Sequence, residues 1–366
     1  MNRMLAIADK ELRQVSRDRM TLAMMVVLPV MQLLLFGYAI NNDVRHMPTL
    51  VLDDDRSAAS RDFVRSMEVT GYYDVVGHAR SYGEVERAFR AGSAKVAVVF
   101  ARGFAEDLLS GRGATLQVIV DGSDPQTVAS ATNTASGLAA ERGASLSLRP
   151  VVPPMRVEPT IWYNPELRTS IFVVPGIIGV ILTMTMVMFT SMAIARERER
   201  GTLEALIVSP VRSVELMVGK LLPYVAVGYV QITLILIAGH LVFDVPFRGS
   251  LPLLYAMSFV FIAANLALGL VFSTLAKTQQ QAMQMSFFFL LPNILLSGFA
   301  FPWEGMPRPA QWLSEVLPLT HYLRIVRGIT LKGSELTDVV RELGWMSVIL
   351  VFFVTLASLR FQKKLG

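Results

Sequence analysis

The chain has 366 residues, of which 53% are hydrophobic and 17% are charged, and its formal net charge is +5. Soluble domains carry about 25% charged residues, so the composition excludes an ordinary soluble protein and indicates a membrane protein with one polar region. The sequence contains no cysteine, which excludes disulfides, thiol chemistry and thiolate metal sites. Most basic residues flank apolar runs, where membrane orientation explains them, so the positive charge does not indicate a nucleic-acid partner.

The first 40 residues predict an interfacial helix and a membrane span. Residues 1–20 combine five basic residues with apolar residues at helical spacing, which is typical of an amphipathic helix on the cytoplasmic face of a membrane. Residues 21–40 carry no charge and are long enough to cross about 30 Å of hydrocarbon. A cleaved signal peptide is the alternative, but the long n-region of mixed charge and the absence of a small-x-small site before Asn41 favour a retained span.

Residues 41–168 have the composition of a globular domain. Short apolar runs alternate with helical patterns, which predicts an α/β domain. Both ends of this domain must return to the same membrane face, so we expect it to be extracytoplasmic. Its aromatic residues Tyr72, Tyr73 and Trp162 are consistent either with a binding surface or with the core. The predicted strands are 49–52, 72–76, 96–100, 116–120 and 157–163, and the predicted helices are 60–69, 82–91, 104–110 and 125–142.

Five further uncharged runs give, with the first, six predicted transmembrane helices. Both termini, including a tail at 360–366, would then be cytoplasmic, in agreement with the basic residues of the segments predicted to be inside. The segment 303–342 is an exception, because it carries five basic residues on the predicted outer side. It contains two predicted short helices, 310–316 and 319–330. The predicted fold class is an α-helical polytopic membrane protein with six transmembrane helices and an α/β extracytoplasmic domain inserted between helices 1 and 2. The five runs are 169–195, 221–243, 249–276, 278–301 and 343–359.

A charged segment, 196–220, separates the second and third predicted spans. Arg196–Arg200 are five charged residues in a row and mark an exit into water. Gly201 breaks this charged helix, and Thr202 can cap a new one because its hydroxyl accepts a backbone N–H of the first turn. Glu204 lies where the helix dipole favours an acid. The segment therefore predicts a short helix between two membrane spans.

One face of this short helix is apolar and has nothing within its own segment to pack against. Leu203, Leu206 and Ile207 share that face at helical spacing, and Pro210 ends the helix. Such a face is suited to dock into another protein. The alternative, which the residues alone leave equally open, is a basic loop that lies on lipid headgroups.

The run Arg196–Glu204 reads RERERGTLE and resembles the E-x-G-T-(L/M)-E segment between the second and third spans of ABC-2 type transporter permeases. The order of one span, a large outer domain and five more spans is also similar to the long form of that family. The resemblance implies that residues 201–211 form a coupling helix, which inserts into a groove of an ATP-binding subunit. On this basis Arg200 and Glu204 are candidate polar contacts with that subunit, and the three apolar residues named above are its apolar contacts.

The same resemblance implies the function and the partners. It implies the membrane-spanning subunit of an ATP-driven exporter, which moves amphipathic compounds such as drugs or lipids across the bilayer of the inner membrane. A working exporter of that family has two permease halves, identical or paralogous, and two ATP-binding subunits. A periplasmic adaptor is a further candidate partner. The segment 303–342 would correspond to two short helices that dip into the outer leaflet.

The sequence lacks a nucleotide-binding motif. Gly219-Lys220 has neither the preceding glycine nor the following Ser or Thr of a P-loop. We therefore expect no ATP hydrolysis and no bound cofactor on this chain, with ATP and Mg²⁺ held by the partner subunit. The four histidines show no ligand-like spacing, so we expect no metal site.

Two other functions are compatible with the order of elements. Half of a proton-driven resistance-nodulation-division exporter has a similar order, but such exporters place acidic residues and a lysine in mid-membrane. The predicted spans here contain only His240 as an ionisable residue, which favours the ATP-driven exporter. A non-transporting membrane anchor or sensor, acting through its outer domain, is the second alternative.

Four uncharged polar residues within the predicted spans are candidates for a substrate path. The alternative is that they make interhelical hydrogen bonds, each worth about 1 kcal/mol. These residues are Gln32, Gln231, Asn265 and Asn293.

Overall fold

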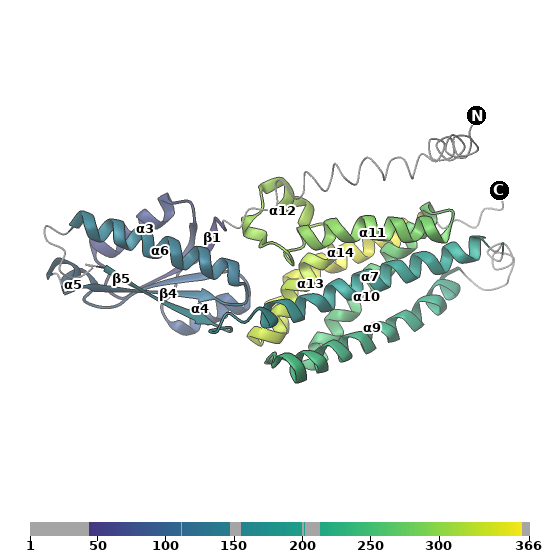
Figure 1. Ribbon diagram of the computed structural model, residues 1–366, viewed down its shortest axis with the longest axis horizontal. Coiled ribbons are helices and arrows are strands. Elements are labelled where there is room, and N and C mark those ends of the chain that lie inside the picture. Colours follow the sequence, from purple (N-terminus) through teal and green to yellow (C-terminus); the bar gives the residue numbers. More distant parts are fainter. Residues whose placement is uncertain (1–43, 111, 147–154, 200, 202–212, 361–366) are drawn as a thin grey trace, which may run out of the picture.

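The computed structural model describes residues 44–110, 112–146, 155–199, 201 and 213–360. These residues form an α/β part built on one sheet and a helical part that extends away from it (Figure 1). The predicted interfacial helix, the predicted first span and the predicted tail lie outside the described residues, apart from Arg360. We call the end of the helical part that meets the α/β part the sheet end. The opposite end, where α7 (Thr169–Glu199) finishes, is the far end.

Five strands form a single mixed sheet in the order β2-β1-β3-β4-β5. β3 and β4 pair antiparallel, and the other neighbouring strands pair parallel. All the side chains of β3 are buried, as its uninterrupted apolar sequence predicts for a central strand that is covered on both faces. The strands are β1 (Met47–Asp53), β2 (Tyr73–His78), β3 (Val96–Phe100), β4 (Ala114–Asp121) and β5 (Met155–Trp162).

Helices cover both faces of the sheet, because successive side chains of each strand point to opposite sides. Val96, Val98 and Phe100 of β3 pack in one core with three of the helices, α3, α5 and α6, whereas Ala97 and Val99 pack in a second core with α4. Each strand and helix predicted for this part is present, with ends that differ by a few residues. The helices are α3 (Ala58–Val69), α4 (Tyr82–Arg90), α5 (Phe104–Ser110) and α6 (Pro125–Leu146).

Two of the aromatic residues whose role the sequence left open take part in packing. Tyr73 is 1% exposed, and its hydroxyl donates a hydrogen bond of 2.6 Å to the Ala131 carbonyl. Trp162 packs edge-on against Phe89, with ring centroids 5.5 Å apart. Tyr73 is therefore a core residue, and Trp162 covers the α4 face of the sheet.

The helical part contains four stretches that, among the described residues, are long and apolar enough to cross a membrane: Thr169–Glu199, Leu221–Phe243, Leu251–Leu275 and Leu336–Arg360. Its elements after α7 are α9 (Ser213–Phe243), α10 (Leu251–Leu275), α11 (Gln279–Leu296), the 3₁₀ turn η1 (Trp303–Gly305), α12 (Arg308–Ser314), α13 (Pro318–Arg327), the π-turn η2 (Gly328–Lys332) and α14 (Leu336–Arg360).

α10 is the central helix of this part and packs against α7, α13 and α14. Phe261 of α10 stacks on Tyr322 of α13 with ring centroids 4.0 Å apart, and Ser258 Oγ lies 2.8 Å from the Tyr322 hydroxyl. Gly179 lets α7 approach α13 closely, because a Cβ at that position would meet a Leu319 methyl at 2.5 Å and the Tyr322 ring at 3.1 Å. The helices at the sheet end are therefore closely packed.

Three of the predicted boundaries differ from the structure by five residues or more. α9 begins at Ser213, inside the segment predicted to be a loop up to residue 220. α11 ends at Leu296, and Gly298 follows in the left-handed conformation, so the predicted span 278–301 is too long, and it is not among the four apolar stretches. α14 begins at Leu336 instead of residue 343, because Glu342 in its second turn pairs with His321 and Arg324 of α13.

Candidate functional site

At the far end, charged residues at the end of α7 form hydrogen bonds with the turn between α10 and α11. Arg198 Nη1 donates to the carbonyls of Ser273, over 3.1 Å, and Ala276, over 2.6 Å. These oxygens belong to the last turn of α10 and its cap, where a helix leaves carbonyls without partners and where positive charge is favourable. Arg198 therefore caps α10 from a neighbouring helix.

Glu199 makes the complementary contact with the start of α11. Its carboxylate accepts hydrogen bonds from the backbone N–H of Gln279, over 2.9 Å, and from the Gln279 amide, over 2.6 Å. An acid at a helix N-terminus is favoured by the helix dipole. Arg196 Nε donates to the same glutamine side chain over 3.1 Å. We call Arg196, Arg198, Glu199 and Gln279 the far-end clamp, because they tie together the ends of three helices.

Gly201 ends α7 in the left-handed conformation, with φ 69°, and its N–H donates to the Arg198 carbonyl over 3.2 Å. A side chain at this position would meet no atom within 4 Å, so the backbone conformation, and not space, favours glycine here. The predicted break at Gly201 is confirmed. The other predicted coupling residues, Arg200, Thr202, Leu203, Glu204, Leu206 and Ile207, lie outside the described residues.

The polar residues predicted as a substrate path have different surroundings. Gln231 accepts a hydrogen bond of 3.0 Å from Thr185 of α7, so it joins α9 to α7. Asn265 donates to the Phe261 carbonyl in its own helix over 2.9 Å, while its amide oxygen has no partner among the described residues. Asn293 is 1% exposed, and neither its amide nitrogen nor its amide oxygen has a hydrogen-bond partner among the described residues. Gln32 lies outside the described residues.

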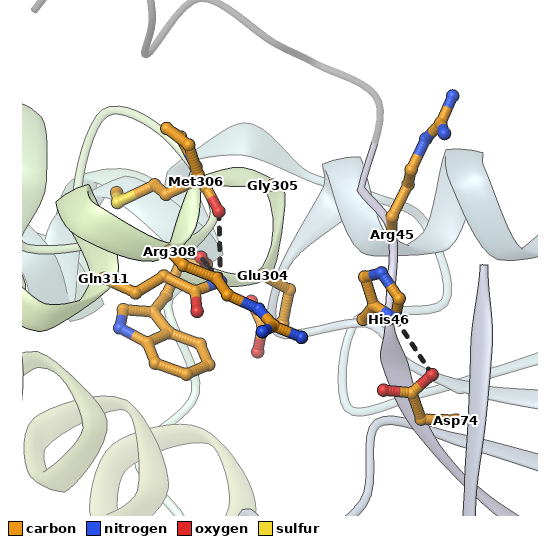
Figure 2. Close-up of a pocket in the computed structure, with 10 residues that line it drawn as sticks. Arg45, His46, Asp74, Glu304, Gly305, Met306, Arg308 and Gln311 are labelled. Carbon is orange, nitrogen blue, oxygen red and sulfur yellow. Dashed lines mark hydrogen bonds and ion pairs between the residues drawn. The ribbon is translucent and has the colours of Figure 1, made fainter. Parts of the chain in front are cut away.

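A cavity of about 580 Å³ lies where the α/β part meets η1 and α12 (Figure 2). On the sheet side, His46 pairs with Asp74 over 3.0 Å. On the helical side, the Gln311 amide donates to the carbonyls of Trp303 and Met306 and fixes that wall. Both carboxylates that line the cavity have partners, Asp74 in His46 and Glu304 in Lys95, which lies 3.6 Å away. None of the predicted substrate-path residues described above lines the cavity.

A cluster of polar and charged side chains lies between α13 and α14 at the sheet end, with His321 fully buried and Arg324 and Glu315 partly exposed. Both ring nitrogens of His321 face oxygen atoms, Nδ1 the Glu342 carboxylate at 2.6 Å and Nε2 the Glu315 carbonyl at 2.9 Å. Arg324 binds Glu315 over 2.6 Å and Glu342 over 3.3 Å, and it lies over the Trp303 ring. These contacts account for some of the basic residues of segment 303–342 and explain why α14 begins before its apolar run.

These contacts were not predicted from the sequence, although one signal pointed to them. The excess of basic residues in 303–342 contradicted the predicted orientation, and the same segment contains Glu315 and Glu342. A segment with both signs of charge at a predicted membrane interface is expected to pair its charges internally. The partners could not be assigned without the fold.

One family profile and several similar proteins cover nearly the whole chain. The profile of the family described as "ABC-2 family transporter protein" matches residues 19–359. The chain is 30% identical to "Probable multidrug ABC transporter permease YbhS" from Escherichia coli (strain K12), over 99% of this chain and 97% of that protein. It is 31% identical to "Probable multidrug ABC transporter permease YbhR" from the same strain, over 99% of each. It is 25% identical to "ABC transporter G family member 20" from Dictyostelium discoideum, over 98% of this chain and 50% of that protein.

Proposed function

This chain belongs to the ABC-2 transporter family and is a membrane subunit of an ABC exporter, and we propose that it moves an amphipathic drug or lipid out of the cytoplasm or the inner membrane. The names of the two Escherichia coli relatives, which describe multidrug permeases, support this substrate class. The family implies an ATP-binding partner and a dimeric arrangement of permeases. ATP and Mg²⁺ would be held by the partner, with no cofactor on this chain, and a periplasmic adaptor would dock on the α/β part.

The proposed topology has six spans, with the α/β part outside and the far end in the cytoplasm. The four apolar stretches, α11 and the uncharged run 21–40 supply the spans. Arg196, Arg198 and Lys277 gather at the far end, which the positive-inside rule favours as the cytoplasmic side. On this topology the coupling segment faces the ATP-binding subunit.

The far-end clamp is the observation that carries the proposed mechanism. The coupling segment, residues 201–211, begins at Gly201, and the clamp fastens the helix before it to the ends of α10 and α11. A force on residues 201–211 would therefore act on three helices together. α7 and α11 also pack along their lengths, with Ser191 Oγ 3.1 Å from Ser286 Oγ.

In the proposed cycle, ATP closes the dimer of nucleotide-binding subunits, which pushes the coupling segment. Leu203, Leu206 and Ile207 would be the apolar contacts of that segment, and Arg200 and Glu204 its polar contacts. The push would repack α7 and α11 at the interface between the two permease halves and move substrate outward. Gln231, Asn265 and Asn293 are proposed to lie along its path.

The test is a pull-down of the tagged chain from native membranes in mild detergent, with the co-purifying proteins identified. A P-loop ATPase should be present with the wild type and lost with the double variant Leu203→Asp and Leu206→Asp. The matched control is Val69→Asp with Leu109→Asp, two exposed apolar residues of the α/β part, which should retain the ATPase. If the wild type brings down no ATPase, the coupling proposal is wrong.

A second variant separates docking from coupling. Glu204→Arg places a positive charge at the proposed polar contact and should leave membrane insertion intact while ATP hydrolysis no longer drives transport. Normal transport by this variant would remove Glu204 from the mechanism without affecting the family assignment.

A further inference from the structure

The α/β part is joined to the helical part through a buried lysine. The Lys332 ammonium group, in the π-turn after α13, forms an ion pair with Asp121 at the end of β4. It also donates to the Phe89 carbonyl over 3.0 Å and lies 5.9 Å from the centre of the Tyr163 ring. The Lys332 side chain is 8% exposed and that of Asp121 is 0% exposed. The ion pair is therefore shielded from water.

Two further contacts join the same parts beside this ion pair. Ser334 Oγ donates to the Arg90 carbonyl at the end of α4 over 2.9 Å. Lys95, before β3, lies 3.6 Å from Glu304 of η1. The end of α4, the end of β4 and the residues before β3 are thus all fixed to segments that follow α11.

On the helical side, the π-turn is packed closely against the connection between α9 and α10. The Arg248 N–H donates to the Thr330 carbonyl over 3.0 Å. Gly249 lies so near that a Cβ there would come within 2.3 Å of the Ile329 carbonyl oxygen. π-turns are rare and are often found at functional sites. Lys332 therefore sits where α13, α14 and the α9–α10 connection meet.

The electrostatic environment opposes separation of the pair. Burial alone raises the pKa of Asp121, but the ammonium groups of Lys332 and Lys95 outweigh burial and hold that pKa below its ordinary value. The carboxylate is therefore charged at neutral pH. Separating the two groups while they stay buried would leave the Lys332 ammonium group without its counter-ion, which is costly in a protein interior.

We propose that Lys332 and Asp121 are positioning residues for transport, which keep the α/β part fixed to α13 and α14 so that the two move as one body through the ATP cycle. The Lys332–Asp121 ion pair stays intact during the cycle, and the helices rearrange nearer the far end. This inference rests on the proposed function, because it needs an ATP-driven movement to transmit.

The absence of cysteine from the sequence allows spin labels to be placed at chosen pairs. The full transporter, with its ATP-binding subunits, is compared without nucleotide and with ATP plus vanadate by electron–electron double resonance. One pair, Arg87→Cys with Arg341→Cys, spans the junction between α4 and α14. A second pair, Leu222→Cys with Lys277→Cys, reports on the far end. All four positions are exposed.

In the otherwise wild-type transporter, the junction pair should give one narrow distance that does not change with nucleotide, while the far-end distance shifts. A nucleotide-dependent shift at the junction would overturn the inference and leave the proposed function standing. If the far-end distance does not shift either, the proposed ATP-driven movement fails, and the inference falls with it.

The role of the pair itself is tested by removing it. In Lys332→Met, the distance distribution between the labels at the junction should broaden or split. Arg102→Met, which removes an exposed positive charge from the α/β part, should leave that distribution narrow. Should Lys332→Met fail to fold, the double variant Lys332→Met with Asp121→Asn removes both charges and leaves neither unpaired. A junction distance that stays narrow in the folded single or double variant contradicts the proposal.

Discussion

The two ends of the helical part use charged residues in opposite ways. At the far end, Arg198 and Glu199 bind the ends of neighbouring helices through side chains that are partly exposed to water. At the sheet end, Glu342 lies within hydrogen-bond distance of His321, and Lys332 is ion-paired with Asp121; these contacts are largely buried. Exposed ion pairs and hydrogen bonds contribute little stability because water replaces them readily. The far-end contacts therefore contribute less stability than those at the sheet end, which resist separation.

The largest expected effect is at the sheet end. Glu342→Ala removes the carboxylate that pairs with His321 and Arg324. His321 Nδ1 is then left without its partner in a fully buried ring, while Arg324 keeps only Glu315. We expect the free energy of unfolding to fall by about 3 kcal/mol. Unfolding of the detergent-solubilised chain can be followed by tryptophan fluorescence, because Trp345 stacks on His321 and Trp303 lies beneath Arg324.

The control for Glu342→Ala is Glu335→Ala, at an exposed position just before the same helix. It should leave unfolding almost unchanged. Equal stability losses in the two variants would show that the buried network does not stabilise the sheet end more than an exposed acid does.

The second prediction tests close packing at the same end. Gly249→Ala would bring a Cβ to 2.3 Å from the Ile329 carbonyl oxygen, so the α9–α10 connection must move away from the π-turn. We expect a loss of about 1–3 kcal/mol, as for other overpacked sites. Gly344→Ala is the matched control, since a Cβ there meets no atom within 4 Å and alanine favours the helix. If the two variants have the same thermal unfolding midpoint, the connection does not constrain the π-turn.

Much of the α/β part could be predicted because its signals are local. The uninterrupted apolar run of β3 predicted a strand that is buried on both faces, and all its side chains are buried. Asp124-Pro125 is a local signal for a helix start, because aspartate caps helices and proline fits the first helical position. The Asp124 carboxylate indeed accepts from the Gln126 N–H over 3.0 Å. Strand order and the antiparallel pairing of β3 with β4 depend on contacts between elements, which the pattern of one chain does not specify.

The candidate site was only partly predictable for the same reason. Gly201 was found from the sequence because a glycine after a charged helix is a local signal. The contacts of Arg198 join residues 75 positions apart, and the Lys332–Asp121 pair joins residues 211 positions apart. The start of α14 was placed too late because its charged residues were assumed to be in water. The partners of Glu342 come from α13, and only the folded chain brings them together.

A smaller stability effect is expected at the far end. Arg198→Ala removes two hydrogen bonds to the last turn of α10 and its cap. Because this site is open to water, the loss should be about 1 kcal/mol. If the far-end clamp links the coupling segment to α10, the variant should still bind the ATP-binding subunit and allow ATP hydrolysis, with transport reduced. The control is Lys277→Ala, which removes a nearby exposed charge. Equal transport by the two variants would show that the far-end clamp takes no part in coupling.

The smallest expected effect separates the charge of the far-end clamp from its hydrogen bonds. Glu199→Gln keeps an oxygen that can accept from the Gln279 N–H but removes the negative charge at the start of α11. We expect a loss of about 0.5 kcal/mol at low salt, because that charge interacts with the helix dipole through water. Added salt screens this interaction, so the difference in thermal unfolding between wild type and variant should shrink as salt rises. For the control Glu158→Gln, at an exposed strand position, the difference in thermal unfolding should not depend on salt. If the difference for Glu199→Gln is also independent of salt, the Glu199 carboxylate is held as firmly as the buried groups at the sheet end.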